Sequence, residues 1–190
     1  EIISNNQVAT AVRLTSGRVI KCQQIFSSIG ALESERVAKV KERSQAGPLS
    51  FVESIFYFKQ KPNSVGIDQT IIFYNNRPQF NYRCPDSLFD DQSSVVCFPN
   101  NFEQDDYNEG IVRVTFIANY HRWSKLSKDE YQKAKQEVAH AALETIYHVA
   151  PEFKQQPVFS DTFTPLTIER YTGHVGGAVY GSPNKWRDGK

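Results

Sequence analysis

The run of residues 111–119 constrains the fold most, because it is largely apolar on both faces of an extended strand. Successive side chains of a strand point to opposite faces of its sheet. One face is entirely apolar, and the other joins two isoleucines to one arginine and one threonine. The first face comprises Val112, Val114, Phe116 and Ala118, and the second comprises Ile111, Arg113, Thr115 and Ile117. This pattern predicts a central strand that is covered on both sides.

A helical periodicity follows this strand. Ser127 and Glu130 have the spacing of a capping box, which marks the first turn of a helix. Apolar residues then recur every three or four positions up to Pro151, namely Tyr131, Ala134, Val138, Ala142, Ile146 and Val149. The pattern predicts one amphipathic helix about 33 Å long. Its alanine-rich stripe favours close packing against a sheet.

Shorter elements surround these two. A hairpin is predicted around Gly17, which can adopt the positive φ of a tight turn, and a helix over residues 31–46 is ended by Gly47-Pro48. Thr164 can cap a last short helix that ends near Gly173. The predicted strands are residues 8–14, 18–26, 51–59, 69–74, 94–98, 111–119 and 157–163. The expected fold class is therefore α+β, with a mostly antiparallel or mixed sheet covered by one long and two short helices.

The composition excludes several classes of protein. The chain has 190 residues, of which 39% are hydrophobic and 23% charged, as is typical of a globular protein. A formal net charge of +1 argues against a nucleic-acid-binding surface. No apolar run approaches the ~20 residues that span a bilayer, and no secretory signal is visible. We expect a cytoplasmic location, with peripheral contact to a membrane left open.

Polar residues offer few candidates for metal or acid–base chemistry. The three cysteines form no CxxC pair, which argues against a zinc site or a disulfide framework. His140, Glu144 and His148 lie four residues apart on the expected helix, but they drift by roughly 80° over eight residues. A solvated helix face is the favoured interpretation, and a metal hydrolase is the alternative. His121 follows a strand and is expected to border the core, with an active-site group as the alternative.

Two loops complete the search for motifs. Residues 100–110 are acidic but lack the alternating ligands and central glycine of a calcium loop. Four glycines, Gly173, Gly176, Gly177 and Gly181, lie within nine residues, and such a segment can bring backbone N–H groups close to a flat ligand. A glycine-rich surface loop is the alternative. No GxGxxG phosphate loop can be built from these residues.

The same glycine segment resembles a known family. The run TPxTxxRYTG…GGAxYG, residues 164–181, resembles the C-terminal part of the phytoene desaturase, carotenoid isomerase and retinol saturase group of FAD-dependent oxidoreductases, within the amine-oxidase-like superfamily. The opening VRLxSGxxI…SSxGA, residues 12–31, resembles the end of the β-unit in the FAD domain of this group. The middle of the chain is similar in the order of its elements and weak in motif.

The resemblance implies a two-domain enzyme, in which a Rossmann-type unit binds FAD and a second domain covers the substrate above the flavin. Because this chain lacks the dinucleotide-binding fingerprint, we expect the substrate-binding part of a longer protein, inactive alone. The expected parts are the edge of the FAD domain (residues 1–47), the substrate-binding domain (residues 48–163) and a return segment towards the FAD domain (residues 164–190). The remaining FAD-binding domain of the same polypeptide is the implied partner.

The resemblance also implies the site. The expected contacts to FAD are Gly176, Gly177, Tyr180 and Gly181. Arg170, Tyr171 and His174 are expected near the substrate, with Arg170 either binding an anion or forming a structural ion pair. The substrate is expected to be a long apolar, carotenoid-like polyene that reacts at its carbon–carbon bonds, and no metal or catalytic acid or base is indicated. The alternative is a stand-alone α+β module that binds an apolar ligand or a protein partner without catalysis.

Overall fold

A five-stranded antiparallel sheet is the largest element of the fold. The computed structural model describes residues 1–6, 8–102, 108–153 and 156–181, so residues 103–107 of the predicted acidic loop lie outside the described residues. The strands are β4 (Ser50–Phe58), β5 (Ile71–Asn75), β6 (Phe89–Cys97), β7 (Gly110–Ala118) and β8 (Phe159–Phe163). Their order is β5-β6-β7-β4-β8, and all neighbours are antiparallel. The α+β prediction and the central position of residues 111–118 are confirmed.

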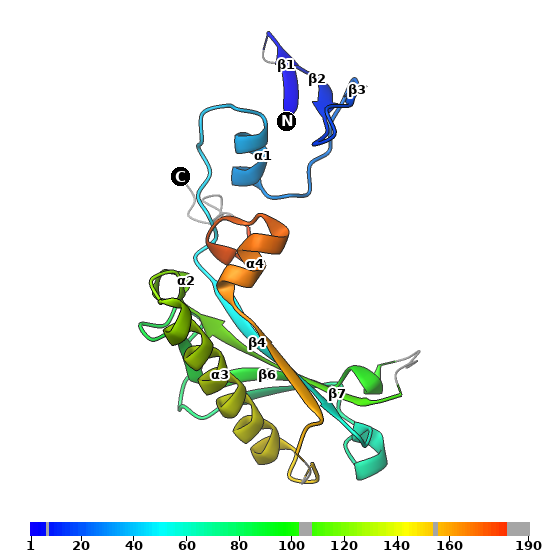
Figure 1. Ribbon diagram of the computed structural model, residues 1–190, viewed down its shortest axis with the longest axis vertical. Helices are drawn as coiled ribbons and strands as arrows, with labels where there is room; N and C mark the ends of the chain where they lie inside the picture. The colour runs from blue at the N-terminus through cyan, green and yellow to red at the C-terminus, as the bar shows by residue number, and fades with distance from the viewer. Residues whose placement is uncertain (7, 103–107, 154–155, 182–190) are drawn as a thin grey trace.

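The long helix α3 (Lys128–Val149) lies across one face of this sheet (Figure 1). Its first turn has the predicted capping box, in which Ser127 accepts the N–H of Glu130 and Glu130 accepts the N–H of Ser127. Fully buried side chains fill the space between helix and sheet, including Val52, Phe56, Val96, Val112, Val114, Phe116, Val138 and Ile146. The buried Ser54 and Thr162 hydroxyls bond to each other at 2.8 Å, so neither is left unpaired.

The second face of the sheet differs from the prediction. The even-numbered residues of β4 are buried, whereas Phe51, Glu53, Ile55 and Tyr57 are only partly buried. On β7, Arg113 is exposed on this second face. On the same face of β7, Ile111 and Ile117 are buried and Thr115 is partly buried. The expectation that residues 111–118 are covered on both sides is therefore correct for the helical face and for both ends of the second face, and wrong at Arg113. We call this second surface the open face of the sheet.

The N-terminal residues form a separate three-stranded sheet, β1 (Ile2–Asn5), β2 (Val8–Arg13) and β3 (Val19–Lys21). The predicted hairpin is present, and Gly17 has a φ of +84° in its turn. Helix α1 (Ala31–Val37) is shorter than the predicted 31–46. It ends because Lys39 adopts the left-handed conformation, with φ of +55°, and the Glu35 carboxylate then binds the N–H groups of Arg43 and Ser44.

Short helical segments follow several of the strands. They are α2 (Tyr120–Trp123), α4 (Pro165–Thr172) and the 3₁₀ turns η1 (Pro62–Val65), η2 (Pro99–Asn101) and η3 (Val175–Gly177). Thr164 caps α4 and Gly173 ends it in the left-handed conformation, as predicted. His121 is exposed within α2, so the prediction that it borders the core is wrong, and Trp123 is the buried residue of this turn.

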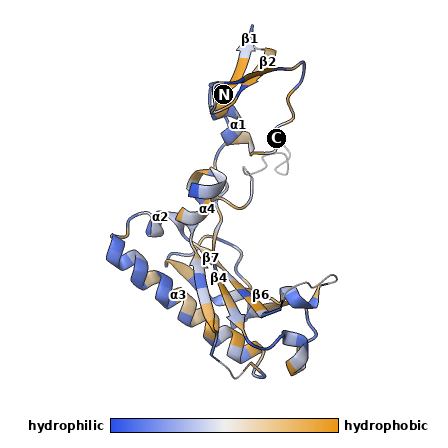
Figure 2. Cartoon of the chain, turned by 45° about the vertical axis from the view of Figure 1, so that its right-hand side comes forward, coloured by the Kyte–Doolittle hydropathy of each residue, from blue (hydrophilic) through white to orange (hydrophobic). Residues whose placement is uncertain are grey.

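The molecule exposes an unusually large surface. Its accessible area is 13015 Å², about 40% more than the ~9,200 Å² expected for a compact monomer of 21.7 kDa. Exposed apolar side chains of the N-terminal sheet contribute, among them Val8, Val19 and Ile20. Figure 2 shows the hydrophobic residues of β1 and β2 in orange. Among the described helices, none is long and apolar enough to cross a membrane.

Candidate functional site

The glycine segment predicted as a ligand site lies beside the start of β4. Ala178 forms an antiparallel bridge with Ser50, and the Ser50 hydroxyl donates to the carbonyl of Gly177 at 2.6 Å. The N–H of Val179 donates to the carbonyl of Leu49 at 3.1 Å. The chain therefore enters and leaves the five-stranded sheet region through two adjacent antiparallel segments. We call these segments, residues 47–50 and 177–180, the crossing.

Close backbone contacts explain why glycines stand in the crossing. A Cβ on Gly177 would collide with the carbonyl of Pro165, and φ at this position is +57°. A Cβ on Gly47 would collide with the carbonyl of Tyr180. These glycines are thus required by the packing of the chain on itself. Gly181 has nothing within 4 Å of a built Cβ, so the fold does not require glycine there.

Two carboxylates bind the N–H groups of the η3 turn. Glu33 of α1 accepts the N–H of Val175 at 3.0 Å, and Glu169 of α4 accepts the N–H of Gly176 at 2.9 Å. Glu169 also accepts the hydroxyl of Tyr120 at 2.5 Å. This donation to a carboxylate raises the pKa of Tyr120, so the phenol keeps its proton and acts as a donor.

A cavity of about 290 Å³ lies between the crossing and α2. Its residues are Ala46, Gly47, Pro48, Ser50, Cys84, Tyr120, His121, Glu169, Val175 and Gly176. Of the seven residues predicted to contact cofactor or substrate, only Gly176 lines it. The phenol of Tyr120 and the carboxylate of Glu169 are among its polar groups. Because they are bonded to each other and Glu169 also binds the N–H of Gly176, they position the η3 turn.

The other predicted site residues spread over different surroundings. Gly177 is buried, and Gly181 is exposed. Tyr180 is half-exposed and packs edge-on against Phe51 and Tyr82, at centroid distances of 5.9 and 6.0 Å. The structure therefore joins Tyr180 to aromatic residues of β4 and of the β5–β6 loop.

The three residues expected near the substrate lie on the outer side of α4 and beyond its end. Arg170 is exposed, and its guanidinium lies 5.7 Å from the ring centre of the exposed Tyr171. His174 Nδ1 lies 3.5 Å from a carboxylate oxygen of Glu33. Among the described residues, no carboxylate lies within ion-pair distance of the Arg170 guanidinium.

The residues of the turn do not fit the pyrophosphate of FAD. The N–H groups of Val175 and Gly176 are already bonded to the two carboxylates, and the N–H of Gly177 bonds to the carbonyl of His174. Two adjacent carboxylates would also repel a diphosphate. Tyr180 and Gly181 remain exposed and could face a flat ring held by other residues.

The open face of the sheet exposes apolar side chains. Its exposed apolar side chains come from both edge strands, and they are Ile71, Phe73, Phe159 and Phe163. Partly buried residues of the inner strands continue it, namely Phe51, Ile55, Tyr57 and Val95. Phe73 is 81% exposed. Side chains of this kind normally contact a ligand, another part of a protein or a partner.

One ion pair lies in the middle of the open face. Glu53 Oε1 accepts from Arg113 Nε at 3.0 Å and from Nη2 at 2.8 Å, and Oε2 accepts from Nη2 at 3.0 Å. The Thr115 hydroxyl donates to Glu53 Oε2 at 2.7 Å. Cys97 is the register partner of Arg113 on β6, and its partial burial raises the pKa of its thiol. The pair is therefore held rigidly by two neighbouring strands.

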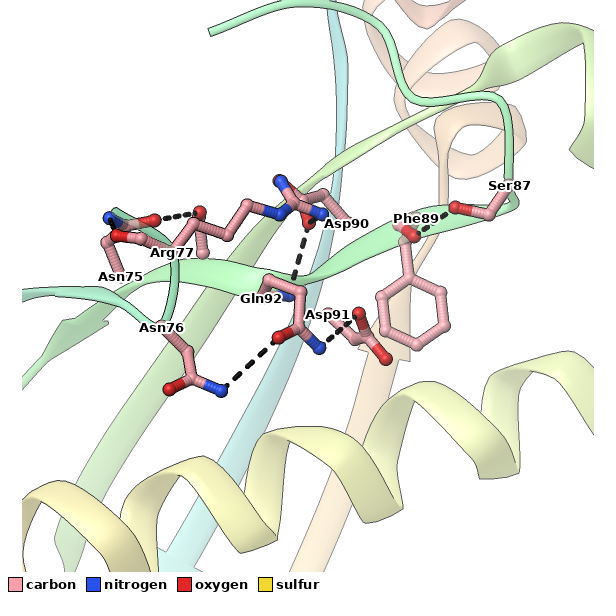
Figure 3. A network of polar contacts seen from close by, with 9 residues as sticks. Asn75, Asn76, Arg77, Ser87, Phe89, Asp90, Asp91 and Gln92 are labelled. Carbon is pink, nitrogen blue, oxygen red and sulfur yellow. Dashed lines mark hydrogen bonds and ion pairs between the residues drawn. The ribbon is translucent and has the colours of Figure 1, made fainter. Parts of the chain in front are cut away.

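A second, polar cavity of about 460 Å³ lies at the start of β6. Its central contact is a bidentate ion pair, with Arg77 Nη1 and Nη2 at 2.9 and 2.8 Å from the carboxylate of the buried Asp90 (Figure 3). Asp90 Oδ1 also accepts the N–H of Gln92 at 3.1 Å. These bonds satisfy the buried carboxylate, so its role in the fold is structural.

The described residues contain no cluster of three or more metal-ligating side chains. His140, Glu144 and His148 are all exposed on α3, and the ring of His148 packs against Tyr74 at 5.2 Å. Burial, together with Asp86, raises the pKa of the Cys84 thiol, which disfavours a reactive thiolate.

Comparisons with known proteins add no relative. No protein-family model matches the sequence, and no curated protein matches it either. The resemblance described above therefore rests on the quoted motifs alone.

Sequence reasoning missed the residues that organise these sites. Glu33, Glu169 and Tyr120 are not predicted, because most of their contacts join distant parts of the sequence. Tyr120 and Glu169 are 49 residues apart, and Glu33 and Val175 are 142 residues apart. Only the bond between Glu169 and Gly176 is local. The pair of Glu53 and Arg113 had one available signal. Both residues interrupt otherwise apolar strand faces, and a charged residue in such a place requires a partner.

Proposed function

We propose that this chain is the substrate-binding part of an FAD-dependent oxidoreductase that acts on carbon–carbon bonds of a long apolar molecule. The open face of the sheet carries this proposal. It presents exposed or partly buried apolar side chains from four of the five strands, β4, β5, β6 and β8, and α3 fills the opposite side. Binding of an apolar chain to this face would be favoured by about 25 cal/mol for each Å² of apolar surface removed from water.

The cofactor belongs, in this proposal, to residues outside those described. The η3 turn uses its N–H groups internally, so its function would be to fix the crossing next to the open face. The exposed apolar strands of the N-terminal sheet support the existence of a further folded part, because Val8, Val19 and Ile20 are 44–61% exposed. When bound, FAD would supply the redox chemistry.

Ligand binding by this chain tests the first part of the proposal. The probe is diphenylhexatriene, an apolar polyene that fluoresces when it leaves water. We expect saturable binding to the 190-residue chain. Replacing Phe73 or Phe159 by Ser removes a large exposed ring from the open face and should weaken binding about fivefold.

Phe26→Ser is the matched control, since Phe26 is 94% exposed but lies outside the five-stranded sheet. It should leave binding unchanged. Equal losses in all three variants, or no saturable binding, would contradict an apolar site on the open face.

The natural full-length protein tests the second part. Purified from cells, it should carry the absorbance of bound flavin, and denaturation should release FAD. A full-length protein without flavin that still binds the polyene would favour a stand-alone apolar-ligand module instead.

A further inference from the structure

The two edge strands of the five-stranded sheet differ in how they are protected. At one edge, β8 carries Asp161 in its middle, and Lys135 of α3 binds that carboxylate at 3.0 Å. Charged side chains on an edge strand disfavour pairing with a further strand. At the other edge, β5 has the sequence Ile-Ile-Phe-Tyr-Asn, with no charged residue and no proline, and its register on β6 is regular throughout. The β5 edge therefore lacks the protection that β8 has.

The register of β5 on β6 shows which of its backbone groups remain unpaired. The carbonyl of Thr70 accepts the N–H of Phe98 at 2.8 Å, and the N–H of Asn76 donates to the carbonyl of Gln92 at 2.8 Å. Because backbone groups alternate in direction along a strand, the even-numbered residues face β6 and the odd-numbered residues face away from it. No described residue bonds to the outward N–H and C=O groups, which belong to Ile71, Phe73 and Asn75.

The side chains of β5 are suited to a strand with the same sequence. Phe73 is 81% exposed, more than any other apolar side chain in the five strands, and Ile71 is 42% exposed. An antiparallel pairing of two copies, centred on Phe73, would place the two Phe73 rings directly opposite each other. Aromatic side chains in such cross-strand positions stabilise the pairing. Phe73 is thus a self-complementary centre for this edge.

The charges at the two ends of β5 favour the antiparallel orientation. Asp68 is exposed shortly before the strand, and no described residue pairs with its carboxylate. Arg77 follows the strand, and 38% of its side chain stays exposed although it binds Asp90. Parallel copies would bring the two Asp68 carboxylates together, and these would repel each other. Antiparallel copies separate them and place each beside Arg77 of the other copy.

We propose that β5 pairs antiparallel with β5 of a second copy of this chain, so that two five-stranded sheets become one sheet of ten strands. The two-fold axis passes through the Phe73 pair and makes the interface the same on both copies. Association ends at the dimer, because β8 is the only other edge of this sheet and is protected. A single strand pair is a small interface, so we expect a dissociation constant of about 10–100 μM.

Sedimentation equilibrium and hydrogen exchange of the 190-residue chain test this inference without any substitution. Between about 1 and 300 μM, the mass should rise from 21.7 kDa towards twice that value. Over the same range, exchange of the outward amides of Ile71, Phe73 and Asn75 should slow about fivefold, as the monomer fraction falls. The amides of Ile72 and Tyr74 already bond to β6 and should not change. A dimer without this alternation would overturn the β5 interface.

Two matched variants locate the interface. Phe73→Lys places two ammonium groups opposite each other at the centre of the strand pair and should raise the dissociation constant at least about tenfold. Phe159→Lys is the control, since Phe159 is 54% exposed on the other edge strand, β8, and it should leave the dissociation constant unchanged. Circular dichroism should show both variants folded, because both side chains are exposed. Dissociation by Phe159→Lys but not by Phe73→Lys would refute the proposal.

The remaining outcomes identify a different occupant of the edge. A chain that stays monomeric at every concentration overturns pairing with a second copy. If the natural full-length protein is then a monomer whose outward β5 amides are protected, another segment of the same polypeptide covers the edge. None of these results depends on the polyene probe, so the dimer and the proposed function can fail separately.

Discussion

The N-terminal region and the five-stranded sheet region bury apolar surface to very different extents. Among described residues 1–37, Ala11 and Leu32 are the buried apolar side chains, and β3 is exposed along its whole length. The sheet and α3 instead enclose a continuous core that contains Phe56, Phe116 and Trp123. Burial of this kind stabilises a fold. We therefore expect the sheet region to provide most of the stability of the described structure, and the N-terminal region to contribute little.

The largest expected effect comes from the core. Phe116→Ala removes a ring that is 1% exposed and should lower the free energy of unfolding by about 3–5 kcal/mol. Val19→Ala, on the exposed β3, should change it by less than about 0.5 kcal/mol. Urea denaturation followed by circular dichroism measures both. Similar losses would show that the two regions form one cooperative core.

A second effect concerns the crossing that joins the regions. Gly177→Ala adds a Cβ against the carbonyl of Pro165 at a positive φ and should cost about 2 kcal/mol or more. Gly181→Ala is the control, because its Cβ would meet open space. The same denaturation measurement applies. A neutral Gly177→Ala would mean that the crossing relaxes without loss.

The capping box of α3 should contribute less. Ser127→Ala removes the acceptor for the N–H of Glu130 and is expected to cost about 1 kcal/mol. Ser16→Ala, in the exposed turn of the N-terminal hairpin, should have no measurable effect. If both substitutions changed the free energy of unfolding equally, the capping box would contribute little to the stability of α3.

The smallest expected effect depends on pH. Partial burial favours a higher pKa for Glu33, but the N–H groups of Val175 and of Glu33 itself, with His174, outweigh it, so the pKa lies below its ordinary value. A carboxylate whose pKa is lowered by folding stabilises the folded state when the pH is above the ordinary pKa. This stabilisation is lost as the pH falls through the lowered pKa.

Hydrogen exchange of the Val175 amide measures this contact. At pH 6, Glu33→Gln should exchange about threefold faster than the unmodified chain, since it loses a charged acceptor. The difference should shrink as the pH falls below 4.5, the ordinary pKa of the carboxyl. Protection that is independent of both the substitution and the pH would remove Glu33 from the crossing.

The sequence predicted those elements whose signal is local. Residues 128–149 became one helix because periodicity and cap lie in adjacent turns, and residues 111–118 became the central strand because both of their faces are rich in apolar residues. The first half of β6 was missed, since Asp90 and Asp91 are unusual in a strand. Asp90 is tolerated there because Arg77, distant by 13 residues, neutralises it.

The candidate site was less predictable for the same reason. The glycines can be recognised in the sequence, but the reason that Gly47 and Gly177 must be glycine cannot. Gly47 contacts Tyr180 and Gly177 contacts Pro165, and these close contacts exist only in the folded chain. The open face was expected to be covered, because an apolar strand face has the same pattern whether a helix, a ligand or another part of a protein lies on it.

The crossing also has a consequence for the ancestry of the molecule. Because Ser50 and Ala178 are bridge partners, the stretch between them starts and ends at nearly the same point in space. A segment with adjacent ends can be inserted into a loop of a host protein without separating the residues on either side. The stretch from residue 50 to residue 178 therefore has the adjacent ends of an inserted domain.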